Sequence, residues 1–121
     1  MYMLLSVGIL TYNQSQYIRQ CLDAVLMQEV DFDYEIVIGD DASTDGTIAI
    51  LEEYEDRVKT VKIIRSEKNE GISMNYKKVL SACTGDYIAL CEGDDFWTDP
   101  HKLQVQVDFL ESHPDYGFVG T

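Results

Sequence analysis

Two acidic clusters in this sequence have the residue types and spacing needed to bind a cation. Asp40 ends the apolar run YEIVIGD and Asp41 follows it, and Glu92, Asp94 and Asp95 follow the apolar run YIALC. Carboxylates this close together repel one another unless a cation lies among them or they cap a helix in a solvated turn. Oxygen ligands suit Mg²⁺ or Mn²⁺, and a site with few protein ligands completes its coordination with substrate phosphates. The second cluster is therefore interpreted as a divalent-cation site.

The first cluster also fits a second kind of site, the calcium-binding loop of an EF-hand. Counting from Asp41, the loop would place acidic or hydroxyl residues at Ser43 and Asp45, a glycine at Gly46 and its final carboxylate at Glu52. An EF-hand loop must follow a helix, however, and the β-branched run before Asp41 is typical of a strand. We therefore expect a strand-to-helix turn here, and we interpret the calcium match as accidental.

The elements that position these clusters are predicted from hydrophobic periodicity. Short apolar, β-rich runs predict strands at 4–10, 34–40, 60–66 and 86–92, and a fifth strand beginning at 116–121. Helical spacing predicts helices at 17–28, 47–54, 72–83 and 99–113, and the third of these has an expected apolar stripe of Tyr76, Val79, Leu80 and Cys83. The alternation predicts a single α/β domain over residues 1–121, Rossmann-like, with a mostly parallel sheet and helices on both faces.

In such a fold, ligands bind beyond the carboxyl ends of the strands. Thr11, Tyr12 and Asn13 follow the first predicted strand, and the two acidic clusters follow the second and fourth. Three segments that are distant in sequence are therefore expected to meet at one edge. An aromatic such as Tyr12 could stack on a nucleobase there, or it could pack on the neighbouring helix.

Composition excludes some partners. The 121 residues include 9 basic and 22 acidic residues, which gives a net charge of 9 − 22 = −13. Nucleic acids and anionic membrane surfaces are bound through Lys and Arg, so neither is expected as a partner. No run approaches the roughly 20 apolar residues of a membrane span, and MYMLLSVGIL lacks the marks of a signal peptide. The three cysteines form an odd set, which favours reduced thiols and a cytosolic setting.

With these elements in place, the chain resembles a known family. The stretches VGILTYNQSQYIRQCLDAVLMQ, YEIVIGDDASTDGT and TGDYIALCEGDDFWTDPHKL resemble the N-terminal half of a family-2 glycosyltransferase of the GT-A fold. The resemblance implies transfer of a sugar from a nucleotide-diphosphate donor, often UDP-linked, to an acceptor with inversion at the anomeric carbon. It also implies a divalent cation, Mn²⁺ or Mg²⁺, at a D-x-D-type motif, and a role in assembling polysaccharide or other glycans.

The resemblance also implies roles for individual residues. It places Thr11, Tyr12 and Asn13 in the loop that holds the nucleoside, with Tyr12 against the base. Asp41 would accept a hydrogen bond from a base N–H, and Asp40 would support that loop. These residues, together with Asp94, form the expected nucleotide-binding set.

The metal set implied by the resemblance is Asp95, Asp94 and Glu92, with Asp95 as the main ligand. One carboxylate would face the ribose and the other the metal on the diphosphate. Glu92 occupies the first acidic position of the D-x-D motif, where its longer reach departs from the family pattern. Lys77 and Tyr76 stand where many relatives carry Asn and Arg, and both departures weaken the match at the donor site.

The implied mechanism is direct displacement, in which a carboxylate base deprotonates the acceptor hydroxyl. Family members run to roughly twice this length, and the base is expected beyond residue 121, so this chain is interpreted as a fragment of a longer enzyme that is inactive alone. The acceptor is expected to be a glycan or a lipid-linked sugar, at the inner face of the cytoplasmic membrane. An exposed edge on the final strand would invite pairing with a second copy.

Other classes fit less well. A sugar nucleotidyltransferase needs a glycine-rich, basic loop after the first strand, and TYNQSQ has neither feature. A receiver domain needs a phosphoacceptor aspartate after the third strand, where only Glu67 is found. A Rossmann dehydrogenase needs G-x-G-x-x-G, of which only Gly8 is present. A nucleotide-binding remnant of a transferase, without turnover, stays open.

Overall fold

The computed structural model of this chain describes residues 4–92 and 99–113. Strands and helices alternate through the described residues, each helix following a strand. The strands are β1 (Leu5–Thr11), β2 (Tyr34–Asp40), β3 (Val61–Arg65) and β4 (Tyr87–Glu92). The helices are α1 (Ile18–Leu26), α2 (Thr47–Arg57), α3 (Ile72–Ala82) and α4 (Lys102–Ser112).

The described strands form one parallel sheet in the order β3-β2-β1-β4. Parallel pairing follows from the connections. Each helix returns the chain to the end of the sheet where the preceding strand began, so the next strand runs in the same direction. The register places Thr11 beside Asp40, and Leu10 beside both Gly39 and Glu92. The strand order reverses at β1, which has β2 on one side and β4 on the other. This reversal is the position where open parallel sheets bind ligands.

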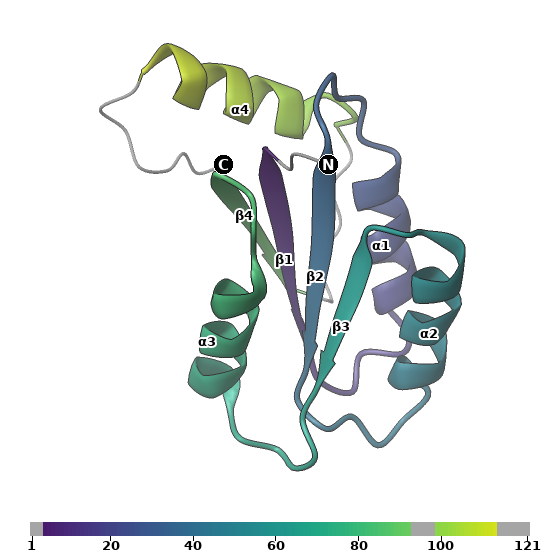
Figure 1. The fold of residues 1–121 in the computed structure, drawn as a ribbon. Helices are drawn as coiled ribbons and strands as arrows, with labels where there is room; N and C mark the ends of the chain where they lie inside the picture. The colour runs from purple at the N-terminus through teal and green to yellow at the C-terminus, as the bar shows by residue number, and fades with distance from the viewer. Residues whose placement is uncertain (1–3, 93–98, 114–121) are drawn as a thin grey trace.

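Helices cover both faces of the sheet, as predicted (Figure 1). Alternate residues of β1, Leu5, Val7 and Ile9, join a core cluster with the buried residues of α1 and α2. The intervening residues face α3, as shown by Val79, which lies against both Gly8 and Gly39. The period of two along β1 therefore divides the sheet into a face under α1 and α2 and a face under α3.

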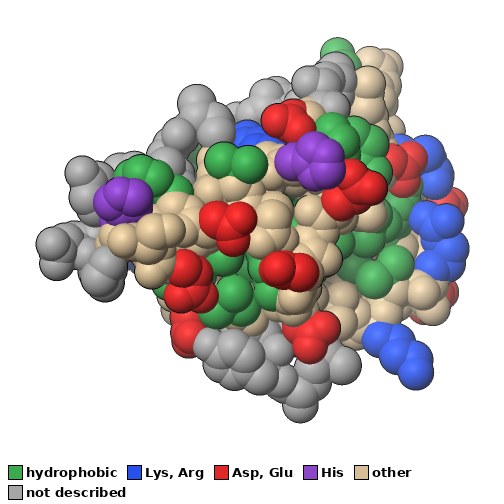
Figure 2. Space-filling model, turned by 90° about the horizontal axis from the view of Figure 1, so that it is seen from above, with side chains coloured by type: hydrophobic (Ala, Val, Ile, Leu, Met, Phe, Trp, Pro, Cys, Tyr) green, Lys and Arg blue, Asp and Glu red, His purple; other side chains and the backbone are tan. Residues whose placement is uncertain are grey.

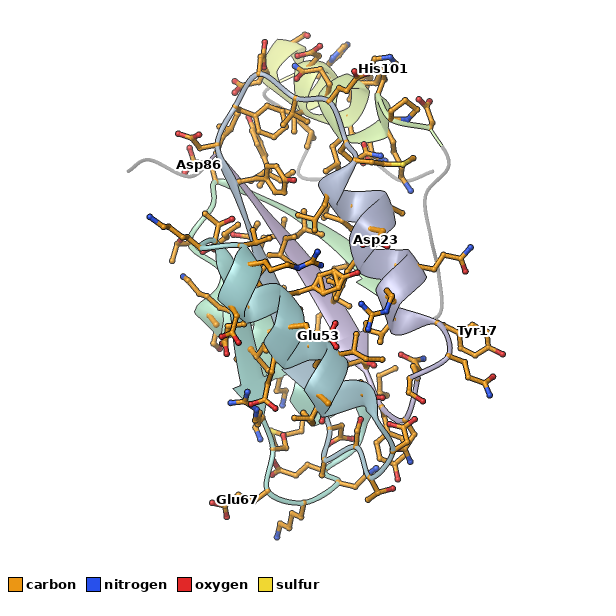
Figure 3. All side chains as sticks on the ribbon, turned by 90° about the vertical axis from the view of Figure 1, so that its right-hand side faces the viewer. Tyr17, Asp23, Glu53, Glu67, Asp86 and His101 are labelled. Atoms are coloured by element: carbon orange, nitrogen blue, oxygen red, sulfur yellow. The ribbon has the colours of Figure 1, made fainter. Side chains whose placement is uncertain are left out.

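The outer surface of the α1–α2 face is held by polar contacts between the two helices. The Tyr54 hydroxyl donates a hydrogen bond of 2.5 Å to Asp23, and Arg19 lies 2.9 Å from Glu53. Asp23 and Glu53 mark the two helices in Figure 3. Exposed ion pairs of this kind contribute little to stability, so the two helices are held in place mainly by the burial of their apolar faces.

Helix α4 crosses the end of the sheet opposite the carboxyl ends of the strands (Figure 1). It is tied to the end of α1 by Gln28, whose side chain donates to the carbonyl of Asp99 (2.7 Å) and accepts from the N–H of Leu103 (2.9 Å). Figure 2 views this end and shows Asp and Glu side chains scattered over it, as expected of a chain with a net charge of −13. Of the predicted nucleotide-binding residues, those that the structure describes lie at or just after the carboxyl ends of β1 and β2, at the other end of the sheet.

The α/β fold and its parallel sheet are thus confirmed, but one helix face was predicted wrongly. The buried residues of α3 are Asn75 and Val79, whereas Tyr76 is 38% exposed. Asn75 is buried in place of Tyr76. Gly39 on the facing strand has no side chain, which leaves room for the amide of Asn75 beside the carbonyl of Gly39. The expected fifth strand at 116–121 lies outside the described residues. Within residues 4–92 and 99–113, no helix is long and apolar enough to cross a membrane.

Candidate nucleotide-binding site

A cleft of about 260 Å³ opens at the carboxyl ends of the strands. It lies where the β1–α1 loop, the end of β2 and the start of α3 meet. Glu67, in the loop after β3, marks this end of the molecule in Figure 3, and His101 marks the opposite end. The cleft is lined by Leu10, Thr11, Tyr12, Gln14, Asp41, Asn69, Gly71, Ile72 and Asn75. Three of the predicted nucleotide-binding residues, Thr11, Tyr12 and Asp41, are therefore brought together here.

Asp41 is buried in the wall of this cleft, and its carboxylate holds the start of α3. One oxygen accepts the backbone N–H of Glu70 at 2.8 Å and the other accepts the N–H of Gly71 at 3.0 Å. The backbone N–H of Asp41 in turn donates to the carbonyl of Thr11 at 3.1 Å. Asp41 thus fixes the loop before α3 relative to the ends of β1 and β2. Each carboxylate oxygen has a second lone pair, so both can still accept from a ligand.

Asp40 holds the loop after β2 rather than lining the cleft. Its carboxylate accepts the N–H of Ser43 at 2.9 Å and the hydroxyl of Ser43 at 2.5 Å. Between them Ala42 has a φ of 64°, in the left-handed region that is unusual for a residue with a Cβ. The two hydrogen bonds that Asp40 accepts from Ser43 stabilise this turn.

Asn13 connects this turn to the β1–α1 loop. Its side-chain oxygen accepts the N–H of Thr44 at 2.7 Å, and its own N–H donates to the Ser43 hydroxyl at 2.9 Å. Asn13 itself has a φ of 50°, a conformation that Asn tolerates better than most residues. Its amide oxygen is therefore occupied in holding two loops together, and Asn13 is absent from the lining of the cleft.

The acidic residues of the calcium-loop pattern hold backbone groups as well. Asp45 accepts from the N–H and hydroxyl of Thr47 (2.9 and 2.5 Å) and from the N–H of Ser15 (3.2 Å). Burial alone would raise the pKa of Asp45, but these hydrogen bonds outweigh it and lower the pKa to about 2. Glu52 lies 3.4 Å from Arg65. Because strand β2 precedes the loop, the EF-hand alternative is wrong.

Polar atoms without a hydrogen-bond partner gather in the cleft. Among the described residues, the buried side-chain atoms without such a partner are Thr11 Oγ1, Gln14 Oε1 and Asn75 Oδ1, and all belong to residues that line the cleft. Burying a polar atom without a partner costs free energy, so such atoms are expected where a ligand completes the set. Tyr12, also in the lining, is 45% exposed and presents an aromatic surface beside them.

The predicted metal ligands are only partly within the described structure. Asp94 and Asp95 lie outside the described residues, and Glu92 is described only as the last residue of β4. The register places Glu92 beside Leu10, which lines the cleft, so the chain enters the acidic cluster next to the cleft. Within the described ranges, no group of three or more His, Cys, Asp or Glu residues is arranged to hold a metal ion.

Sequence reasoning missed several residues of the site, above all Gln14 and Asn75. Gln14 stands in a polar loop and gave no signal that separates it from its neighbours. Asn75 gave no signal either, because it lies outside the apolar stripe that was predicted for this helix, where a polar residue is expected. Lys78 on α3 contacts the carboxylate of Glu70 and donates to Ser66 (3.0 Å). It braces the loop before α3.

Comparison with known proteins agrees with this geometry. The sequence model of glycosyl transferase family 2 matches residues 6–121. An uncharacterised protein of Mycobacterium tuberculosis is 47% identical over 112 residues, which cover 92% of this chain and 32% of that protein. The putative glycosyltransferase EpsE of Bacillus subtilis is 37% identical over 111 residues, which cover 91% of this chain and 39% of EpsE.

A solved structure shows the same fold. The crystal structure of S. aureus TarS 1–349 in complex with UDP-GlcNAc superposes with a TM-score of 0.82 at 29% identity. The superposition covers 93% of this chain and 32% of the TarS 1–349 chain. This chain therefore spans about a third of the length of the two curated relatives, which are 32% and 39% covered.

Proposed function

This chain belongs to glycosyl transferase family 2, and we propose that it forms the donor-binding part of an inverting glycosyltransferase that uses a UDP-sugar. The observation that carries the proposal is the cleft at the strand-order reversal, where unpartnered polar atoms lie beside an exposed aromatic ring. Such a combination suits a flat, polar-edged group such as a nucleobase. The likeness to TarS, whose structure holds UDP-GlcNAc, supports a UDP-linked donor.

In this proposal the nucleoside lies in the cleft. Tyr12 stacks on the base, and Asp41 and Thr11 meet its polar edge from the ends of β2 and β1. Asp40 and Asn13 act indirectly, because their side chains hold the loops that carry these groups. The diphosphate then extends toward the end of β4, where Glu92 leads into Asp94 and Asp95.

The acidic segment after β4 is proposed to hold Mn²⁺ or Mg²⁺. Its donor set is made of carboxylates, which are the hard oxygen ligands these cations prefer, and Glu92, where the segment begins, pairs with Leu10 of the cleft lining. We propose Asp95 as the main ligand, with Asp94 and Glu92 beside it. A bound cation would supply positive charge next to the departing diphosphate.

The proposed reaction is a direct displacement at the anomeric carbon, with inversion. A carboxylate base takes the proton of the acceptor hydroxyl as that oxygen attacks from the face opposite the diphosphate. We assign the base to no residue of this chain. The acceptor is proposed to be a glycan or a lipid-linked sugar that is extended during polysaccharide assembly. We propose that the reaction takes place in the cytoplasm or at the inner face of the cytoplasmic membrane. We also propose that the chain can associate with a second copy.

The metal role predicts a specific loss. In Asp95→Ala, the affinity for Mn²⁺ in the presence of UDP is expected to fall by at least about tenfold, because a charged oxygen ligand is removed. Electron paramagnetic resonance of free Mn²⁺ during a titration measures this affinity. The matched control is Asp99→Ala, since the Asp99 carboxylate accepts from the backbone N–H of His101 (2.9 Å) at the start of α4. Equal Mn²⁺ binding by the two variants would contradict the assignment.

A further inference from the structure

Cys21 and Cys91 bring two thiols into contact in the core, although they are 70 positions apart in the sequence. Cys21 lies on α1 and Cys91 on β4, and their sulfur atoms are 3.5 Å apart. Either thiol can donate the hydrogen bond between them. Both residues are buried, with exposed fractions of 0% and 6%. The fold therefore juxtaposes two side chains that can form one covalent bond.

The direction of the Cys91 side chain follows from the alternation along β4. Cys91 pairs with Ile9 of β1, and paired residues of neighbouring strands point to the same face of a sheet. Ile9 and Cys91 belong to the core cluster under α1 and α2, and Ala89 packs against this cluster. The intervening Leu90 lies over Gly8, on the face under α3. Cys91 is therefore directed toward α1 by its place in the strand.

The buried stripe of α1 directs Cys21 to the same place. The residues of this stripe are each 0% exposed and recur at the spacing of one helical face: Ile18, Cys21, Leu22 and Val25. The sulfur atoms of a disulfide are about 2.05 Å apart. From their present separation of 3.5 Å, the two sulfurs must therefore approach by about 1.5 Å. Rotation about the Cα–Cβ bonds moves each sulfur on this scale.

Cys83, the third cysteine of the chain, is more accessible but lies elsewhere. It is half-buried at the end of α3, the helix that covers the other face of the sheet. Burial raises the pKa of its thiol, which lowers the share of the reactive thiolate. Contact in the fold, rather than exposure, therefore selects which two of the three cysteines react together.

We propose that Cys21 and Cys91 are a redox-sensitive pair, which hydrogen peroxide converts into a disulfide between α1 and β4. The sulfur of one cysteine, as thiolate, attacks an oxygen of the peroxide and the O–O bond breaks. A sulfenic acid forms, and the departing hydroxide takes up the thiol proton as water. The second sulfur then attacks the sulfenic sulfur, the S–O bond breaks and a second water leaves. Two thiols together lose two electrons, and one peroxide is reduced to two waters.

The disulfide would add a covalent tie to β4, which among the described strands is hydrogen-bonded to β1 alone. Hydrogen peroxide is small, so brief local opening of the fold gives it access to the buried thiols. A cross-link between residues 70 positions apart also restricts the unfolded chain. The oxidised chain is therefore expected to unfold at a temperature at least about 5 °C higher than the reduced chain. Neither cysteine lines the cleft, so the inference does not depend on the proposed function.

The test treats the folded, unaltered chain with hydrogen peroxide, alkylates the remaining thiols and identifies linked peptides by mass spectrometry. We expect a linkage between Cys21 and Cys91 that is at least about tenfold more abundant than any linkage to Cys83, because the two thiols are held in contact. Dithiothreitol should reverse both the linkage and the rise in unfolding temperature. Cys83→Ala is the matched control, since it removes the more accessible thiol and should leave both results unchanged.

Cys21→Ala removes the pair, and alanine suits a position within α1. In this variant, once circular dichroism shows that it is folded, peroxide should no longer raise the unfolding temperature, and the same rise would overturn the inference. Two results with the unaltered chain would overturn it without any variant. In one, Cys21 and Cys91 remain thiols, or are oxidised without linking, at a peroxide concentration that oxidises Cys83. In the other, linkages to Cys83 are as abundant as the linkage between Cys21 and Cys91.

Discussion

Asp41→Ala is expected to lower the affinity of the chain for UDP by at least about 100-fold. The carboxylate has two tasks, and the substitution removes both. It removes the anion that is proposed to meet the base, and it leaves the N–H groups of Glu70 and Gly71 without their acceptor. Because Gly71 lies in the lining of the cleft and precedes α3, movement of this loop changes the shape of the cleft as well. Calorimetric titration with UDP measures the loss.

Glu67→Ala is the control for Asp41→Ala. Glu67 is an exposed carboxylate at the same end of the molecule (Figure 3), but it is absent from the lining of the cleft. It tests whether any loss of negative charge near the carboxyl ends of the strands has the same effect. The affinity of Glu67→Ala for UDP is expected to stay within about twofold of that of the unaltered chain. The electrostatic interaction between the exposed Glu67 carboxylate and bound UDP acts over a long distance and is screened by salt. If a folded Asp41→Ala chain bound UDP as tightly as Glu67→Ala does, Asp41 would have no place in the donor site.

Glu35→Ala is expected to lower the free energy of unfolding by about 3 kcal/mol, the largest stability effect we anticipate. Glu35 is a buried carboxylate on β2, 1% exposed, which ties together three other segments. It lies 2.8 Å from Lys62 on β3 and accepts from the Ser6 hydroxyl of β1 (2.6 Å) and the N–H of Thr84 (2.6 Å). Removing the carboxylate leaves these donors without their acceptor, and it leaves a cavity where the side chain was packed. Chemical denaturation measures the change, with the exposed Glu53→Ala as a control that is expected to change little.

The same residue predicts how stability depends on pH. Burial alone would raise the pKa of Glu35, but the hydrogen bonds from Lys62, Ser6 and Thr84 outweigh it and hold the pKa at about 2, below its ordinary value of 4.5. A lowered pKa in the folded state means that the ionised group stabilises the fold above its ordinary pKa. This contribution should be lost as the pH falls from 4.5 toward about 2.

Glu35→Gln isolates that contribution, because the amide keeps the size of the side chain and removes its charge. The difference in unfolding free energy between the unaltered chain and Glu35→Gln is expected to be greatest near about pH 7 and to narrow near about pH 3. A difference that does not change over this range would show that the charge of Glu35 contributes nothing to stability.

Much of the fold could be predicted because its local signals agree with its tertiary contacts. The run from Tyr34 to Asp40 is apolar and β-rich, and it forms a strand with these same ends. The β1 run is apolar at every second residue on one face and carries Ser6 and Gly8 on the other. Its predicted strand character therefore did not depend on knowing that α3 covers the second face. Helix ends were less accurate, since α2 continues to Arg57, beyond its predicted end.

The site was predictable where residues follow a strand and less so where a helix supplies them. Tyr12 and Asp41 were found because the ends of parallel strands meet at one edge. Asn75 was missed because its burial depends on a glycine, Gly39, on a strand distant in sequence, which leaves room for a polar side chain under α3. The roles of Asp40 and Asn13 depend on hydrogen bonds to the turn around Ala42, whose left-handed conformation has no sequence signal as strong as a glycine.

The central claim is that the cleft between the β1–α1 loop and the start of α3 binds the nucleoside of a nucleotide-sugar donor, with a divalent cation on its diphosphate. Calorimetric titration of the unaltered chain with UDP, with and without Mn²⁺, tests it most directly. We predict one UDP per chain, bound at least about tenfold more tightly when Mn²⁺ is present. No binding by a chain shown to be folded, or binding that Mn²⁺ leaves unchanged, would contradict the claim.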